Sequence, residues 1–305
     1  MSYIQPLRKP MTEKFLNCSV LHYDCNIVIE GLVRSLKSSG LNPAGLLIMG
    51  ASGLGKSTAI RLFKKEYSKP ATETHTYQTV VSVITPENGT VKSMTCALLK
   101  ALGCPTPDRG SAHSMFIRAV KLMENLETKI IIFDEIQHLT EKNAQKKTKP
   151  VINFVKNLMS ETNCPVVLVG MPDAKDLLEL DEQIERRFSK TIMLNPFSMN
   201  NEKVNHDYTD TDLFFSFLHT IADIMPIDTI NIKDPVVAKR ILAASKGKIS
   251  IIIKILEYVI ENNEGELATL SDFSRAYSEI SDYDIQYCPF IITTKQLEKL
   301  YFLEG

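Results

Sequence analysis

The chain has 305 residues, of which 44% are hydrophobic and 23% are charged, and its formal net charge at pH 7 is −1. This is the composition of a folded globular protein, and the length predicts two domains, or one large and one small domain. The charge excludes a uniformly basic protein, so any nucleic-acid-binding surface must be a local patch set against acidic regions elsewhere.

Six cysteines are scattered along the chain without a CxxC pair or a histidine at ligand spacing. They are typical of reduced thiols in a cytosolic protein rather than of zinc or disulfide sites. Met1 to Pro10 lacks the apolar core of a signal peptide, and no apolar run approaches the ~20 residues of a membrane span. We therefore expect a cytoplasmic protein with no membrane partner.

The first two thirds of the chain alternate between short apolar runs and helical patterns. Residues 1–14 are polar and interrupted by proline, which predicts an extended arm. Helices are predicted at 15–38, from the glycine-rich turn to about 67, and at 90–102, 112–126 and 151–161, and strands at 46–49, 77–84, 129–133 and 164–170. Buried strands that alternate with helices are typical of a parallel, three-layer α/β sheet.

After residue 197 the pattern changes. Helices are predicted at 211–225, 234–245, 249–263 and 270–280, with no convincing strand before 290. The predicted domains are an N-terminal arm and helix (1–40), an α/β core (41–198), a helical domain (199–285) and a tail (286–305). The apolar run Phe290–Ile292 in the tail either packs on the helical domain, which we favour, or forms a hook for a partner.

Gly50–Ser57 has the sequence GASGLGKS and lies between a predicted strand and a predicted helix. Glycines let consecutive backbone N–H groups surround a phosphate, and the helix N-terminus adds positive potential. Lys56 is suited to reach the β- and γ-phosphates, and Ser57 to offer its hydroxyl to Mg²⁺. The segment predicts a P-loop for ATP and Mg²⁺, with a structural glycine turn as the alternative. Its binding residues are Gly50, Ala51, Ser52, Gly53, Leu54, Gly55, Lys56, Ser57 and Thr58.

The apolar run Ile130–Phe133 ends in two carboxylates, Asp134 and Glu135. In a parallel sheet these lie at the carboxyl edge, where the P-loop also lies. Asp134 is suited to hold Mg²⁺ together with Ser57, and Glu135 to polarise the attacking water as a general base. The pair favours an ATP hydrolase over a kinase-like transferase. A solvated acidic pair after a strand is the alternative.

Lysines gather in a predicted loop at 141–149, at positions Lys142, Lys146, Lys147 and Lys149. They form either a solvated face or a surface that contacts DNA phosphates without recognising sequence. Lys92, Arg118 and Lys121 would extend that surface if they faced the same way. The chain has no helix-turn-helix pattern or interleaved aromatic residues that would indicate base recognition.

Arg186 and Arg187 are adjacent in the segment Glu185–Phe188. Either arginine could reach the γ-phosphate in a neighbouring subunit, and hydrolysis would then require assembly. The alternative is a salt-bridged pair on the surface.

Four segments together resemble an AAA+ ATPase, and more specifically the TniB/TnsC-type transposition regulators: GASGLGKS, IIIFDEIQHL, NCPVVLVGMPDA and DEQIERRF. The resemblance covers residues 15 to about 260. It implies a RecA-like αβα core with a parallel sheet, a small C-terminal helical lid, and ATP-dependent assembly into rings or a filament around double-stranded DNA. It also implies two further partners, a transposase and a target-selection adaptor.

By this resemblance Lys56 and Ser57 are the Walker A ligands, and Asp134 and Glu135 are the Walker B pair. Arg186 or Arg187 is the finger that acts in trans. Arg187 is slightly less favoured, because Phe188 should anchor it to the core. The DNA-contacting surface of the family corresponds here to the surroundings of Thr90, Lys92 and Lys121.

The chain departs from the family pattern at two positions. Gly170-Met171 stands where a polar sensor residue is usual, and a methionine side chain cannot hydrogen-bond the attacking water. In the lid, Ser250 stands where many AAA+ proteins have an arginine, and Lys248 lacks the guanidinium fork. Both departures predict slow hydrolysis by a nucleotide site that serves mainly assembly.

The sequence therefore favours an ATP-dependent, DNA-binding regulator of transposition. There are three alternatives. The first is an AAA+ protein with another DNA role, such as a replication initiator; the second is a secretion ATPase; and the third is a P-loop phosphoryl transferase. No winged-helix pattern follows residue 265, which weakens the initiator alternative, and the lack of a membrane segment weakens the secretion alternative.

Overall fold

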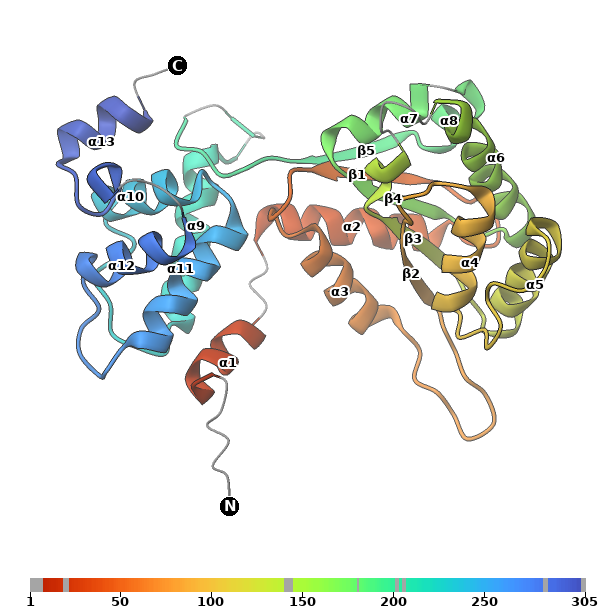
Figure 1. Cartoon of the computed structure of the whole chain (residues 1–305), viewed down its shortest axis with the longest axis horizontal. Helices are drawn as coiled ribbons and strands as arrows, with labels where there is room; N and C mark the ends of the chain where they lie inside the picture. The colour runs from red at the N-terminus through yellow and green to blue at the C-terminus, as the bar shows by residue number, and fades with distance from the viewer. Residues whose placement is uncertain are drawn as a thin grey trace. The chain divides into compact units, whose positions relative to one another are not determined.

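The structure is a computed structural model, which describes residues 8–18, 22–139, 145–179, 181–200, 203, 204, 207–281 and 285–302 (Figure 1). The contacts divide the chain into two compact units. The α/β unit comprises Asp24–Ser52 and Lys56–Asn195, and the rest of the chain forms the helical unit. Within the described ranges, no helix combines the length and the apolar character needed to cross a membrane.

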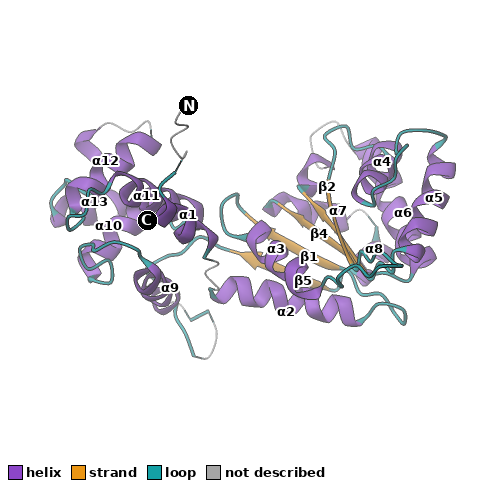
Figure 2. Ribbon diagram, turned by 90° about the horizontal axis from the view of Figure 1, so that it is seen from below, coloured by secondary structure: helices purple, strands orange, loops and turns teal. Residues whose placement is uncertain are grey.

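The α/β unit is built on a five-stranded sheet in which every strand pair is parallel (Figure 2). The strand order is β2-β3-β4-β1-β5. Because β4 lies between β1 and β3, the carboxyl ends of these three strands lie side by side. The strands are β1 (Leu46–Gly50), β2 (Val80–Ile84), β3 (Ile130–Asp134), β4 (Val166–Gly170) and β5 (Lys190–Leu194).

Helices cover both faces of this sheet (Figure 2). One face is covered by α2 (Tyr23–Lys37) and α3 (Lys56–Tyr67), and the other by α4 (Val91–Ala101), α5 (Ala112–Asn125) and α6 (Gln145–Thr162). Two short helices, α7 (Asp176–Glu179) and α8 (Glu182–Arg187), follow β4. This is the three-layer α/β architecture that the sequence predicts.

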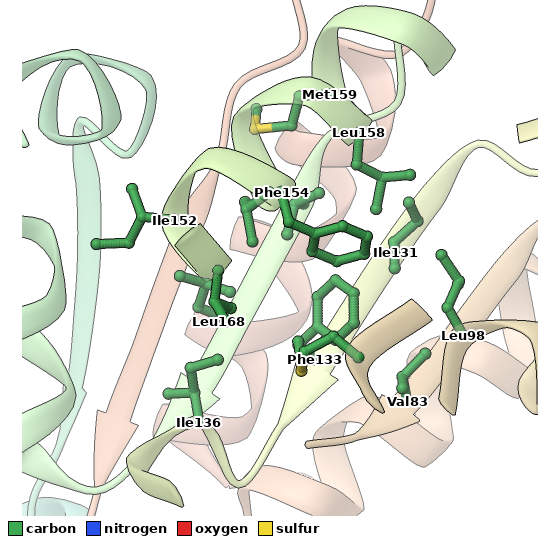
Figure 3. Close-up of a cluster of buried hydrophobic side chains, with 14 of the residues drawn as sticks. Val83, Leu98, Ile131, Phe133, Ile136, Ile152, Phe154, Leu158, Met159 and Leu168 are labelled. Atoms are coloured by element: carbon green, nitrogen blue, oxygen red, sulfur yellow. The ribbon is translucent and has the colours of Figure 1, made fainter. Parts of the chain in front are cut away.

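The hydrophobic core beside α4 and α6 is continuous from the sheet to the helices (Figure 3). The rings of Phe133 and Phe154 meet edge to face, with centroids 6.3 Å apart. Leu98 and Leu158 are fully buried on either side of this pair. Each such buried side chain stabilises the fold by roughly 1.5–3 kcal/mol, so the strand that ends in Asp134 is held by packing along its length.

Two elements of this unit differ from the sequence-based expectation. β5 was not expected, because at an edge strand the burial alternates and Thr191 and Met193 are exposed. Helix α6 begins at Gln145, although the expectation was a loop to residue 149 and a helix from Val151. Pro150 is the sixth residue of this helix, where proline removes the hydrogen bond to the carbonyl four residues earlier.

The helical unit has its own core, formed by the apolar faces of α9, α10, α11 and α12 around buried phenylalanines such as Phe214, Phe217 and Phe273. Isolated bridges are the only strand-like pairings in the described part of this unit. The helices are α1 (Pro10–Asn17), α9 (Asp210–Ile224), α10 (Pro235–Ser245), α11 (Ile249–Asn262), α12 (Leu270–Ile280) and α13 (Thr294–Tyr301).

The extended arm predicted for residues 1–14 is wrong where the structure describes it, because helix α1 begins at Pro10. Proline fits the first position of a helix, where an N–H would have no partner. Phe15 is buried against the helical core, and Arg8 forms an ion pair with Glu257 at 2.6 Å. The backbone N–H of Lys9 donates to the carboxylate of Glu261 at 2.9 Å. Helix α1 therefore packs with the helices at the other end of the chain.

The tail packs on the helical unit, as the favoured alternative predicts. Phe290 is buried in the core, and Ile292 is buried with Leu297 of α13. The buried guanidinium of Arg240 donates to the carbonyl of Ile292 at 2.8 Å and also to the carbonyl of Pro289. The buried guanidinium has lost its hydration, and these backbone carbonyls take the place of the lost water molecules. The two hydrogen bonds therefore fix the course of the tail across α10.

His22 is buried beside aromatic rings of the helical unit. Its imidazole meets the rings of Phe197 and Phe217 edge to face, at centroid distances of 6.0 and 6.1 Å. Its Nδ1 has no hydrogen-bond partner among the described residues. Burial lowers the pKa of His22 to about 4, because an imidazolium would lose its hydration there without gaining a partner.

We expect the helical unit to lose stability in mild acid because of His22. The unfolded chain takes up a proton at the ordinary pKa of 6.5, whereas the folded chain resists protonation down to about pH 4. Stability should therefore fall as the pH falls through this window, by about 2 kcal/mol between pH 7 and pH 5. Urea unfolding of the wild type and of His22→Gln across this range measures the loss.

The variant should have a flatter pH dependence than the wild type. The exposed His219 supplies the control, because His219→Gln should keep the wild-type slope. Parallel curves for the wild type and His22→Gln would contradict the explanation.

Candidate nucleotide site

The glycine-rich turn follows directly from strand β1. The strand ends at Gly50, the turn covers residues 51–55, and α3 begins at Lys56. Gly53 and Gly55 have φ angles of +87° and +95°, in the left-handed region that favours glycine. The turn therefore has the backbone that a phosphate-binding loop requires, followed by the N-terminus of a twelve-residue helix.

Lys56 lies inside this turn rather than in solvent. Its side chain is buried, and Nζ donates to the carbonyl oxygens of Gly50 at 2.5 Å and Ala51 at 2.9 Å. Burial lowers the pKa of Lys56, and the negative charges of Asp134 and Glu135 act in the opposite direction. The ammonium group is thus held at the loop by weak acceptors that the stronger oxygens of a phosphate can replace.

Ser57 and Asp134 meet although they are 77 residues apart in the chain. Ser57 Oγ lies 3.4 Å from Asp134 Oδ2. The other carboxylate oxygen, Oδ1, accepts the backbone N–H of Glu135 at 2.9 Å. A hydroxyl and a carboxylate are the hard oxygen ligands that Mg²⁺ prefers, so the pair fits the magnesium role that the sequence assigned to it.

Burial raises the pKa of Asp134. The neighbouring charge of Glu135 acts in the same direction, while the N–H of Glu135, the ammonium of Lys56 and the hydroxyl of Ser57 oppose the rise. A bound cation would favour the ionised carboxylate for the same reason that Lys56 does.

Glu135 has a left-handed backbone, with φ at +59°, and its side chain is exposed. Its Oε2 accepts a hydrogen bond from Nε2 of Gln137. Gln137 Oε1 in turn accepts the backbone N–H of Met171, just after β4, at 3.2 Å. Sequence reasoning missed Gln137; the only available signal was a polar residue two positions after the acidic pair.

Arg186 and Arg187 have different surroundings. Arg187 donates to the carbonyl of Lys156 at 3.0 Å and to Ser160 Oγ at 3.1 Å, both on α6. The side chain of Arg186 is 82% exposed and lies 3.9 Å from Glu182, a weak ion pair. Of the two, Arg186 is therefore the one available to another molecule.

Helix α8, which carries both arginines, is fixed at its start by Asp181. This carboxylate caps the helix by accepting the N–H groups of Gln183 and Ile184, and it forms an ion pair with Lys156 at 2.8 Å. The hydrogen bond from Lys156 holds the pKa of Asp181 below its usual range. Arg186 is thus presented from a helix with a fixed N-terminus.

The residues assigned to DNA contact divide into three groups. Thr90 is the N-cap of α4 and forms a reciprocal capping box with Ser93, so its hydroxyl already has a structural role. Lys92 on α4 and Lys121 on α5 are exposed, and these two helices pack against each other. Lys142 and the side chains of Lys146 and Lys147 lie outside the described residues.

The two lid residues named by the resemblance lie at the start of α11. Lys248 is its N-cap and Ser250 is in its first turn.

Solved structures with the same fold include proteins of Aeropyrum pernix and Pyrobaculum aerophilum. The Orc1 protein of Aeropyrum pernix, in a structure with DNA, matches with a TM-score of 0.59 and 21% identity over 88% of this chain and 69% of that one. The ORC2 protein of Aeropyrum pernix matches with a TM-score of 0.60 and 13% identity over 90% and 72%. Cdc6p of Pyrobaculum aerophilum matches with a TM-score of 0.59 and 16% identity over 93% and 71%. At these identities the likeness shows the fold.

A comparison with curated proteins found no match. The family model described as "Bacterial TniB protein" matches residues 26–198, which is more than half of the chain and includes the P-loop, the acidic pair and both arginines. The chain therefore belongs to the TniB family and has the fold of an AAA+ ATPase, with a parallel α/β core and a C-terminal helical region.

Proposed function

We propose that this protein is an ATP-dependent, DNA-binding regulator of transposition, which assembles on target DNA and connects target selection to the transposase. The observation that carries the proposal is the meeting of Ser57 and Asp134 at 3.4 Å beside the buried Lys56, in a chain of the TniB family. This arrangement supports binding of ATP with Mg²⁺ at the carboxyl edge of the sheet.

In this proposal Lys56 exchanges its two carbonyl acceptors for the β- and γ-phosphates, and Ser57 and Asp134 hold the metal. Held there, Mg²⁺ would neutralise charge that develops on the phosphates. Glu135 orients a water molecule and takes its proton as the water oxygen bonds to the γ-phosphorus. The bond from that phosphorus to the bridging oxygen breaks, and ADP and inorganic phosphate leave.

We further propose that hydrolysis depends on assembly. Arg186 is exposed on α8, so it is free to reach the nucleotide of a neighbouring copy in a ring or filament. A guanidinium stabilises charge on the transferring phosphoryl group, and its arrival from a neighbour would make hydrolysis a property of the assembly. Slow turnover fits this use, since Met171 has no hydrogen-bonding side chain and Ser250 has no cationic one.

For DNA binding we propose the exposed lysines Lys92 and Lys121, together with Lys142, Lys146 and Lys147. Lysines act as point charges on phosphates, so binding should depend on salt and little on sequence. A protein of the same fold, the Orc1 protein of Aeropyrum pernix, is described in complex with DNA. We place the protein in the bacterial cytoplasm, where its DNA target and the transposase would be found.

The likeness to Orc1 and Cdc6 favours one second candidate, an AAA+ protein with an initiator-like role on DNA. The two candidates differ in the DNA that supports assembly. A regulator of transposition should assemble on unrelated duplexes, whereas an initiator should require a defined duplex sequence.

Glu135→Gln tests the proposal. We expect ATP turnover to fall at least about 100-fold, because the proton acceptor is lost, while ATP-dependent assembly on DNA persists or strengthens. Turnover is measured by phosphate release, and assembly by electron microscopy of the protein with ATP and two duplexes of unrelated sequence. Glu66→Gln, on the exposed face of α3, is the matched control and should behave as the wild type.

Monomers that respond to neither ATP nor DNA would refute the proposed function. Assembly on only one duplex would favour the initiator-like candidate. Collapse of Glu135→Gln assemblies would show that Glu135 is structural.

Arg186→Ala should lower the rate of ATP hydrolysis by assemblies about 10³-fold, with little loss of ATP binding. Mixing Arg186→Ala subunits with Glu135→Gln subunits should restore part of the activity, since each supplies what its neighbour lacks. Arg187→Ala is the control. It should lower the free energy of unfolding by about 1–3 kcal/mol, because the variant loses the hydrogen bonds from Arg187 to α6. Mixtures that remain inactive would rule out a finger that acts in trans.

A further inference from the structure

The side chain of Gln137 connects two parts of the sheet edge that the sequence separates by more than thirty residues. It lies in the 3-10 turn Ile136–Leu139 that follows β3. Its Oε1 accepts the N–H of Met171 at 3.2 Å, and its Nε2 donates to Oε2 of Glu135. One amide group thus joins the end of β4 to the carboxylate that follows β3.

The orientation of this amide is determined by its partners. A backbone N–H can only donate, so the atom of Gln137 that faces Met171 must be the oxygen. The NH₂ group is then directed to Glu135, whose ionised carboxylate can only accept. Reversing the amide would place two donors together at Met171 and two acceptors together at Glu135.

Gly170 leaves the space that this amide occupies. A Cβ atom at position 170 would lie 3.0 Å from Oε1 of Gln137 and 2.6 Å from Cγ2 of Ile136. Any larger residue at the end of β4 would therefore push the turn and its glutamine away from Met171. The absence of a side chain at position 170 and the presence of Gln137 are two parts of the same arrangement.

Apart from the one with Gln137, the hydrogen bonds of Glu135 in the described part of the chain involve its backbone. Its side chain is exposed, Asp134 Oδ1 accepts its N–H, and its carbonyl accepts the N–H of His138 at 3.2 Å. A long exposed side chain loses rotamer freedom when it must adopt one position for proton transfer, and a misplacement of about 1 Å can cost 100-fold in rate.

We infer that Gln137 is a positioning residue for ATP hydrolysis, which holds the Glu135 carboxylate at the β4 side of the site through the amide bridge from Met171. The inference rests on the proposed function, because it assigns to Glu135 the role of general base. It adds Gln137 to the residues of the site and explains why position 170 is a glycine.

The test replaces Gln137 with methionine, which has a similar length and neither hydrogen-bonding group. We expect kcat for ATP, measured on DNA-bound protein, to fall about 10- to 100-fold with KM changed by less than twofold. Gln137→Glu should also lower kcat, because its carboxylate would face Glu135. If either variant failed to bind a fluorescent ATP analogue, the other would carry the test.

Gln78→Met is the matched control. Gln78 is also a half-buried glutamine of the α/β unit, and its Nε2 donates to the carbonyl of Ala101 at 2.7 Å, before the start of β2. The Gln78→Met variant loses a comparable hydrogen bond at a position far along the chain from the acidic pair. This variant should keep the wild-type kcat.

Non-additivity separates positioning from a general structural role. In a Glu135→Gln background, adding Gln137→Met should leave the residual single-turnover rate unchanged within twofold, because the group that Gln137 positions is already absent. An equal further loss in that background would overturn the inference, as would a wild-type or raised kcat in Gln137→Met alone. A wild type that binds ATP without hydrolysing it would overturn the proposed activity and this inference together.

Discussion

The parallel pairing of β1, β4 and β3 is the constraint on which the candidate site depends. Since the three strands run in the same direction, their carboxyl ends deliver the P-loop, Met171 and the acidic pair to one edge of the sheet. The strands contribute little chemistry themselves. Their fully buried side chains hold the register that places Ser57 within reach of Asp134. A change that moved β4 relative to its neighbours would therefore separate these groups from one another, even if it left each group itself unaltered.

The electrostatics of the site are consistent with a ligand that carries both signs of charge. Burial lowers the pKa of Lys56 and raises that of Asp134, so the surroundings disfavour the charged form of each. A triphosphate supplies anionic oxygens to the lysine and a bound magnesium ion supplies positive charge to the carboxylate. Binding would therefore relieve two unfavourable burials at once, which is a physical reason for a nucleotide to stabilise this fold strongly.

The features that could be predicted from sequence are those that depend on neighbouring residues in the chain. The glycine turn, the apolar strand before Asp134 and the helical patterns after residue 197 are local signals. Strand β5 has no clear local signal because an edge strand buries alternate residues. Helix α1 has none because a proline at a helix start has the same local pattern as a proline in an extended arm. Gln137 could not be found, since its partner Met171 lies on another strand. The different surroundings of Arg186 and Arg187 likewise depend on α6, whose contacts no local pattern encodes.

The left-handed backbone at Glu135 has a consequence for how this position balances folding against activity. A residue other than glycine in this region costs of order 1 kcal/mol, and a glycine or asparagine would adopt the same φ with less strain. The chain is thus less stable with a glutamate here than it would be with a residue chosen for the turn alone. A glutamate that strains the backbone and has an exposed side chain fits a position maintained for its chemistry. Selection of this chain for thermal stability alone would be expected to favour a glycine or an asparagine over the carboxylate at position 135.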